Sequence, residues 1–198
     1  GGIGAAQAMT FRHLVFGVLI ALAPCGAAAA RDFTSTIDES AAIARIRPEF
    51  RTPDEPNQLF YVQRSPNSNT VIYAARLDAA GAINRGDPVE AFWRKFNIDG
   101  SRQPLNFIER MMAYGVKAVR TDANIPVTFS IAALPERRIT LTLDAAKRPQ
   151  ALMQIGPHTV KLAYVYLQVV EGGLMPDVPS LDIFGTDIAS GKAVHEHL

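Results

Sequence analysis

The stretch Val160-Lys161-Leu162-Ala163-Tyr164-Val165-Tyr166-Leu167-Gln168-Val169-Val170 decides the fold class. It is rich in the β-branched and aromatic residues that strands favour. Side chains alternate along a strand, so Val160, Leu162, Tyr164 and Tyr166 are predicted to share one face, and Ala163, Val165, Leu167 and Val169 the other. Because both faces are largely apolar, we predict a central strand that is covered on both sides.

Seven shorter strands are predicted around this one. Each combines apolar residues with flanking turn residues, and 138–144 alternates most cleanly, with Ile139, Leu141 and Leu143 pointing one way. The other six ranges are 59–64, 70–77, 127–133, 151–155, 180–186 and 192–197.

Two short helices are expected between the strands. In the first, Asp87 is the predicted N-cap and Pro88 the first helical residue, followed by an apolar stripe of Val89, Phe92, Trp93 and Phe96. The second begins near Pro104 and runs to Tyr114, and Gly115 is expected to end it in the left-handed conformation. Both helices are expected to cover part of the sheet. The predicted fold class is therefore α+β, a β-rich antiparallel sheet or sandwich of about eight strands with two short helices.

Residues 1–30 have the pattern of a secretory signal peptide. Arg12 and His13 precede the apolar run 14–23, and small residues from Gly26 to Ala30 favour cleavage between Ala30 and Arg31. Pro24 disfavours a lipid anchor on Cys25, and a retained membrane helix would have to include the weakly apolar Ala/Gly tail. We expect a periplasmic or secreted protein with no membrane span once the signal is removed.

The remaining chain is predicted to contain a polar N-terminal arm (31–56) and a single globular domain (57–198). The full chain has 20 Lys+Arg and 19 Asp+Glu, and cleavage would remove Arg12 and the single cysteine. The mature protein would then be cysteine-free and formally neutral, so its core alone must stabilise it. The lack of a basic excess argues against nucleic acid as a partner.

Familiar catalytic motifs are absent from the sequence. It contains no G-x-S-x-G, H-E-x-x-H, Walker-type glycine loop or C-x-x-C. The catalytic residues stay unknown at this stage, and no cofactor or metal is indicated.

Arg64-Ser65-Pro66-Asn67-Ser68-Asn69 is the densest polar cluster and lies at a predicted hairpin tip. Arg64, Asn67 and Asn69 are candidate ligand contacts, although the same residue types are common in turns. Trp93 and Tyr114 are candidate walls of an adjacent pocket, although aromatic stripes usually lie in a core. A pocket of Tyr164, Tyr166 and Arg64 is a further alternative.

The C-terminal His195-Glu196-His197 places two imidazoles on one face of a predicted strand. Asp182 or Asp187 would have to supply a third metal ligand. We expect instead a loose, solvated C-terminus. His158 follows Pro157 in a predicted turn and is expected to be exposed.

Several segments resemble an exported bacterial family catalogued as domain of unknown function 4833. These are Leu59 to Tyr73 (LFYVQRSPNSNTVIY), Pro88-Val89 followed by Trp93, Ala113-Tyr114-Gly115, and Gly185-Thr186-Asp187 with Gly191-Lys192. The resemblance covers about residues 57–198. It implies a single exported domain and carries over no catalytic residue.

Three functions remain open from the sequence. The first is an extracytoplasmic binding or assembly module for a small ligand or an envelope protein. The second is an unrecognised hydrolase or transferase near the Arg64–Asn69 tip, with Asp87 or Asp144 as base. The third is a purely structural component of the envelope.

Overall fold

The computed structural model describes residues 35–39, 45–170 and 177–198, which all belong to one compact unit, Phe33–Leu198. The predicted signal peptide lies outside the described residues. So do residues 31–34 and 40–44 of the predicted N-terminal arm.

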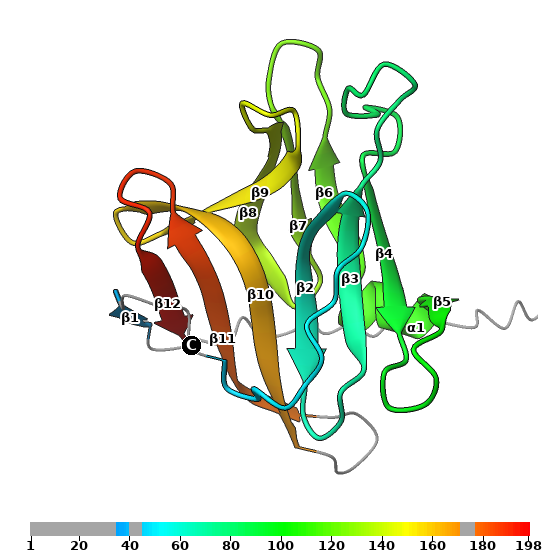
Figure 1. Cartoon of the computed structure of the whole chain (residues 1–198), viewed down its shortest axis with the longest axis vertical. Coiled ribbons are helices and arrows are strands. Elements are labelled where there is room, and N and C mark those ends of the chain that lie inside the picture. The colour runs from blue at the N-terminus through cyan, green and yellow to red at the C-terminus, as the bar shows by residue number, and fades with distance from the viewer. Residues whose placement is uncertain (1–34, 40–44, 171–176) are drawn as a thin grey trace, which may run out of the picture. The chain divides into compact units, whose positions relative to one another are not determined.

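The described residues form twelve strands and one helix (Figure 1). In chain order the elements are β1 (Thr36–Asp38), β2 (Gln58–Arg64), β3 (Thr70–Ala75), β4 (Val89–Arg94), β5 (Arg102–Pro104), α1 (Phe107–Met112), β6 (Val116–Arg120), β7 (Val127–Ile131), β8 (Leu134–Leu143), β9 (Pro149–Ile155), β10 (His158–Val170), β11 (Asp177–Asp187) and β12 (Ala193–His197).

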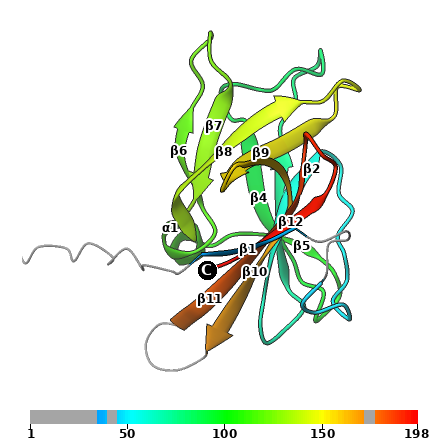
Figure 2. The ribbon, with the colours of Figure 1, turned by 90° about the vertical axis from the view of Figure 1, so that its left-hand side faces the viewer.

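The strands make one curled sheet in the order β5-β4-β3-β2-β10-β9-β8-β7-β6, with β11, β12 and β1 branching from β10 (Figures 1 and 2). Strand β10 lies at the branch point. Along one edge it pairs with β9 near its start and with β2 nearer its end, and along the other edge it pairs with β11. The β2–β10 pair is parallel and all the others are antiparallel, so the predicted antiparallel sheet is corrected to a mixed one.

All eight predicted strands are present, but the two helix predictions are largely wrong. Residues 89–94 form strand β4, because they pair with β3 on one side and β5 on the other. The second helix shrinks to the six residues of α1, with a capping box between Asn106 and Glu109. None of its residues is buried, so it does not cover the sheet as expected.

Two hydrophobic clusters lie on opposite faces of the sheet. The larger, here called the main core, lies inside the curl and includes Phe60, Tyr73, Phe129, Ile139 and Ile183. The smaller, the second core, lies on the other face of β2, β3, β4, β10 and β11 and includes Tyr61, Ile72, Phe92, Tyr164 and Phe184. Phe50 from the N-terminal arm packs into the second core, so the arm helps to cover that face.

A β-bulge at Ala163 changes which residues of β10 share a face. Leu162 pairs with Gly185 and Tyr164 with the adjacent Phe184, which leaves Ala163 as the extra residue. Val160 and Leu162 therefore share the main core with Val165 and Leu167, and Tyr164 and Tyr166 lie in the second core. The prediction that β10 is covered on both sides is confirmed. The predicted grouping of Tyr164 and Tyr166 with Val160 and Leu162 is wrong.

Two glycines are required because other atoms approach closely. A Cβ on Gly185 would lie 2.2 Å from Val160 Cγ1 and 2.5 Å from the Lys161 carbonyl oxygen, next to the bulge. Gly115 does not adopt the left-handed conformation, since the described glycines with positive φ are Gly81, Gly100, Gly156 and Gly191. Instead, a Cβ on Gly115 would lie 1.9 Å from the Arg110 carbonyl oxygen. The backbone at position 115 therefore passes too close to α1 for any residue with a side chain.

We predict that Gly185→Ala destabilises the protein by about 2–3 kcal/mol, since the new methyl group overpacks a backbone contact that has little room to relax. Urea denaturation measures the loss. The matched control is Gly86→Ala, whose Cβ would meet only Asn84 Oδ1 at 3.4 Å. Equal midpoints for the two variants would show that the bulge tolerates a side chain.

Candidate functional site

Arg64 lies at the end of β2, where the strand register places it beside two other polar residues. Gln63 pairs with Thr70 and Thr70 with Arg94. Extending this register by one residue sets Arg64, Asn69 and Lys95 in a row across three chain segments. By strand alternation the row lies on the main-core face, and all three residues are half-buried.

Two aromatic side chains form the floor beneath this row. Trp93 and Tyr114 are 4% exposed and meet edge to face, with ring centroids 5.1 Å apart. The Lys95 ammonium lies over the Trp93 ring, 4.2 Å from its centroid, in a cation–π contact. The row and the floor together are called the Arg64 cluster below (Arg64, Asn69, Trp93, Lys95, Tyr114).

Tyr114 connects the floor to Arg64. Burial raises the pKa of the Tyr114 phenol, and the adjacent Arg64 guanidinium offsets part of that rise. The backbone of Tyr114 is fixed as well, because its carbonyl accepts a hydrogen bond of 2.7 Å from the Tyr73 hydroxyl. Tyr114 is therefore held at both its backbone and its ring.

Two buried donors beside Tyr114 have no acceptor. Arg64 Nε and Trp93 Nε1 are both inaccessible to solvent, and neither makes a hydrogen bond within the described part of the chain. Buried polar groups are normally paired, so an unpaired donor calls for an explanation such as a bound group. Here two such donors belong to residues that both contact the same tyrosine.

The polar loop after β2 is anchored at several points. Ser65 Oγ donates to the Val169 carbonyl and accepts from the Val169 amide, at 3.1 and 2.8 Å. Asn67 Oδ1 accepts from the Asn69 amide, a turn contact, and Asn69 Oδ1 accepts from the Asn97 amide at 3.3 Å. The Asn67 side chain therefore stabilises the turn, which is the alternative role that the sequence analysis gave for this residue type.

The structure therefore brings together Arg64, Asn69, Trp93 and Tyr114 of the five predicted residues, and Asn67 supports the loop. Sequence reasoning missed Lys95. Lys95 follows Trp93 by two residues, and this spacing places both side chains on one face only if 89–95 is extended. The alternative pocket of Tyr164, Tyr166 and Arg64 does not form, since the two tyrosines lie in the second core and Arg64 lies on the opposite face.

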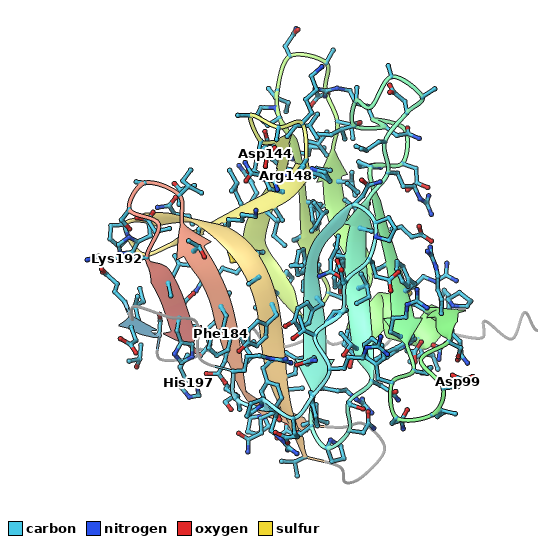
Figure 3. All side chains as sticks on the ribbon, in the orientation of Figure 1. Asp99, Asp144, Arg148, Phe184, Lys192 and His197 are labelled. Atoms are coloured by element: carbon cyan, nitrogen blue, oxygen red, sulfur yellow. The ribbon has the colours of Figure 1, made fainter. Side chains whose placement is uncertain are left out.

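The acids proposed as general bases are not near Arg64. Asp87 forms an ion pair with Arg76 and precedes β4, seven residues before Arg94 at the end of that strand, or about 20 Å at the rise of a strand. Asp144 binds Arg148 in the β8–β9 turn, and both are labelled at the opposite end of the sheet from the end of β2 (Figure 3). A general base must reach its proton directly or through one water, so neither acid serves with Arg64.

A second cluster lies at the C-terminal strand. His195 Nε2 and His197 Nδ1 each lie 2.8 Å from Asp182 Oδ1, and Asp182 is 6% exposed. The His195 ring stacks on Phe184 at 4.4 Å, which extends a ladder of stacked rings through Tyr164 to Tyr61. Figure 3 shows Phe184 and His197 on adjoining strands.

The expectation of a loose, solvated C-terminus is therefore wrong. Strand β12 pairs with both β1 and β11, and Glu196 is 2% exposed and accepts from Arg137 Nη2 at 2.7 Å. His158 is not free in solvent either, because its Nε2 lies 2.9 Å from Glu39 Oε1. Among the described residues, no group of three or more His, Cys, Asp or Glu is arranged to hold a metal ion.

Two hollows, of about 240 and 180 Å³, lie elsewhere on the surface. The first lies between the arm and the β4–β5 turn, around Arg51, Glu55 and Phe96, and the second lies around Arg120 and Arg138. Neither contains a residue of the Arg64 cluster.

The family comparison gives one match. The family described as "Domain of unknown function (DUF4833)" matches residues 60–197. The chain belongs to this family. The match confirms the resemblance seen in the sequence and includes every residue of the Arg64 cluster. No curated protein and no solved structure matches the chain. No helix in the described part is long and apolar enough to cross a bilayer.

We predict a pH-dependent role for Asp187, the other acid considered as a metal ligand. Its carboxylate accepts from the Ser190 hydroxyl and amide at 2.6 and 3.1 Å, and these hydrogen bonds hold its pKa below the usual range. The charged form therefore stabilises the fold above the ordinary carboxyl pKa, and this contribution disappears as the pH falls through the lowered value. Asp187→Asn should be less stable than wild type at pH 7, with the gap closing in acid.

Thermal denaturation from pH 7 to pH 2 measures that gap. The exposed Asp122→Asn is the control, because its carboxylate makes no hydrogen bond among the described residues. A gap for Asp187→Asn that stayed constant with pH would contradict the charge-dependent role.

Proposed function

We propose that this protein is an exported binding module whose Arg64 cluster binds a small organic anion. The export is inferred from the signal-like pattern of residues 1–30. The ligand class is inferred from two cations and one amide in a row, Arg64, Lys95 and Asn69, above an aromatic floor. Arginine suits a carboxylate or phosphate because its donors match their oxygens, and lysine adds a second positive charge.

The observation that carries the proposal is the pair of buried, unpaired donors at Arg64 Nε and Trp93 Nε1. Leaving a buried donor unpaired costs about 1–3 kcal/mol. An acceptor oxygen that reached either donor would remove that cost, and the Lys95 ammonium over the Trp93 ring would favour a charged acceptor. Within the described residues, no carboxylate lies within ion-pair distance of Arg64 or Lys95.

An envelope protein that presents an acidic side chain or a C-terminal carboxylate is the second candidate ligand. The two unpaired donors favour this candidate as well. The row of the Arg64 cluster is half-buried and binds one anionic group, whichever molecule carries that group. It differs from the first candidate in size, which mass spectrometry resolves.

We predict that Trp93 fluorescence reports anion binding. Trp93 is the single tryptophan of the chain and lies within the cluster, so its emission is sensitive to a charge beside it. Titration with inorganic phosphate, acetate and benzoate should give a saturable change for at least one of them. Arg64→Ala and Lys95→Gln should each weaken binding tenfold or more, in line with the roughly 1.5–3 kcal/mol of a hydrogen bond to a charged group.

The matched control is Arg148→Ala, since Arg148 is an exposed arginine at the other end of the sheet. Unchanged affinity in Arg64→Ala, or no saturable signal with any of the anions, would contradict the proposed site. Native mass spectrometry of protein purified from its own envelope fraction then weighs the natural ligand, and the same spectrum shows whether the chain starts at Arg31.

A further inference from the structure

Helix α1 presents an apolar stripe to solvent. Phe107, Ile108, Met111 and Met112 recur at helical spacing, and they are 72%, 65%, 51% and 53% exposed. These four residues are called the α1 stripe below. Exposed clusters of large apolar side chains on an otherwise soluble surface mark interaction sites.

The stripe projects from the fold rather than lining a groove. No α1 residue is buried, and neither hollow described above includes one. The helix has six residues, a quarter to a third of the length that spans a bilayer. A short projecting apolar helix suits shallow insertion between lipid headgroups, where the aromatic and aliphatic side chains reach the acyl boundary.

Two cations lie close to the stripe. Arg110 lies on α1, and Lys117 on β6 follows Gly115, whose backbone meets the Arg110 carbonyl. Arg120, the last residue of β6, lies at the end of that strand away from α1 (Figure 2). Neither Arg110 nor Lys117 has a carboxylate within ion-pair distance in the described ranges, and Arg110 Nε donates to the Leu105 carbonyl. The one acid on α1, Glu109, is engaged in the capping box. An excess of unpaired positive charge beside an apolar stripe is complementary to an anionic surface.

A second copy of the chain fits these observations less well. A twofold contact through α1 would bring Arg110 and Lys117 of each copy together. The four side chains also offer only about half of the roughly 800 Å² per partner of a standard protein interface.

We propose that the α1 stripe docks the protein on an anionic phospholipid surface, with Phe107 and Ile108 inserted and Arg110 and Lys117 on the headgroups. This docking does not depend on ligand binding at the Arg64 cluster, so either proposal stands if the other fails.

Vesicle flotation tests the docking. Protein purified from its own envelope fraction is mixed with vesicles of phosphatidylcholine alone or of equal parts phosphatidylcholine and phosphatidylglycerol. We expect tenfold or stronger partition onto the anionic vesicles at 50 mM salt, with a loss of most of it at 500 mM. Phe107→Ser/Ile108→Ser should lower partition tenfold or more, and Arg110→Gln/Lys117→Gln should remove the preference for anionic lipid.

The matched control is Ile188→Ser, since Ile188 is 53% exposed but lies in the β11–β12 turn. Unchanged thermal stability of the double serine variant shows that it folds. Equal partition of the double variant and the wild type would overturn the proposal. So would light scattering in which the wild type is a dimer, the variant is a monomer and neither binds vesicles, because the stripe would then join two copies.

Discussion

The bulge at Ala163, opposite Gly185, lets strand β10 pack against two separate cores. Without the extra residue, Tyr164 and Tyr166 would continue on the face of Val160 and Leu162 and would have to fit inside the curl. With it, the aliphatic residues of β10 line the main core and its tyrosines stack outside. Because β2, β9 and β11 are all hydrogen-bonded to β10, the directions of the three arms of the sheet follow from this strand.

The sequence predicts eight of the twelve strands of the described residues, because strands that pack on one or both faces carry a clear pattern. Its main error, the helix at 89–96, has a physical cause. Strand β4 contacts the main core through Val89 and Trp93 and the second core through Phe92. A strand with apolar residues on both faces places them at irregular spacings, and here those spacings coincide with the i, i+3, i+4 spacing of a helix.

The sequence predicts the residue types of the candidate site better than it predicts their arrangement. Arg64 and Asn69 were found as loop polar residues, and Trp93 and Tyr114 as aromatic residues near a pocket. Their meeting depends on the register of β2, β3 and β4, which no local pattern gives. The bulge, likewise, is visible only once Gly185 is known to face Leu162. The sequence left Asp182 and Asp187 open as partners of His195 and His197 and favoured a loose C-terminus, whereas in the structure Asp182 ties the two histidines of β12 to β11.

Helix α1 poses a different problem, because a helix with no buried residue needs another means of being held in place. Its flanks supply it. Leu105 before the helix and Tyr114 after it are buried, the Tyr73 hydroxyl binds the Tyr114 carbonyl, and Gly115 lets the chain return close to the Arg110 carbonyl. The position of α1 is thus fixed by residues outside the stripe. The four apolar side chains of the stripe are therefore not needed to hold the helix in place. For this reason a partner surface explains their exposure better than packing does.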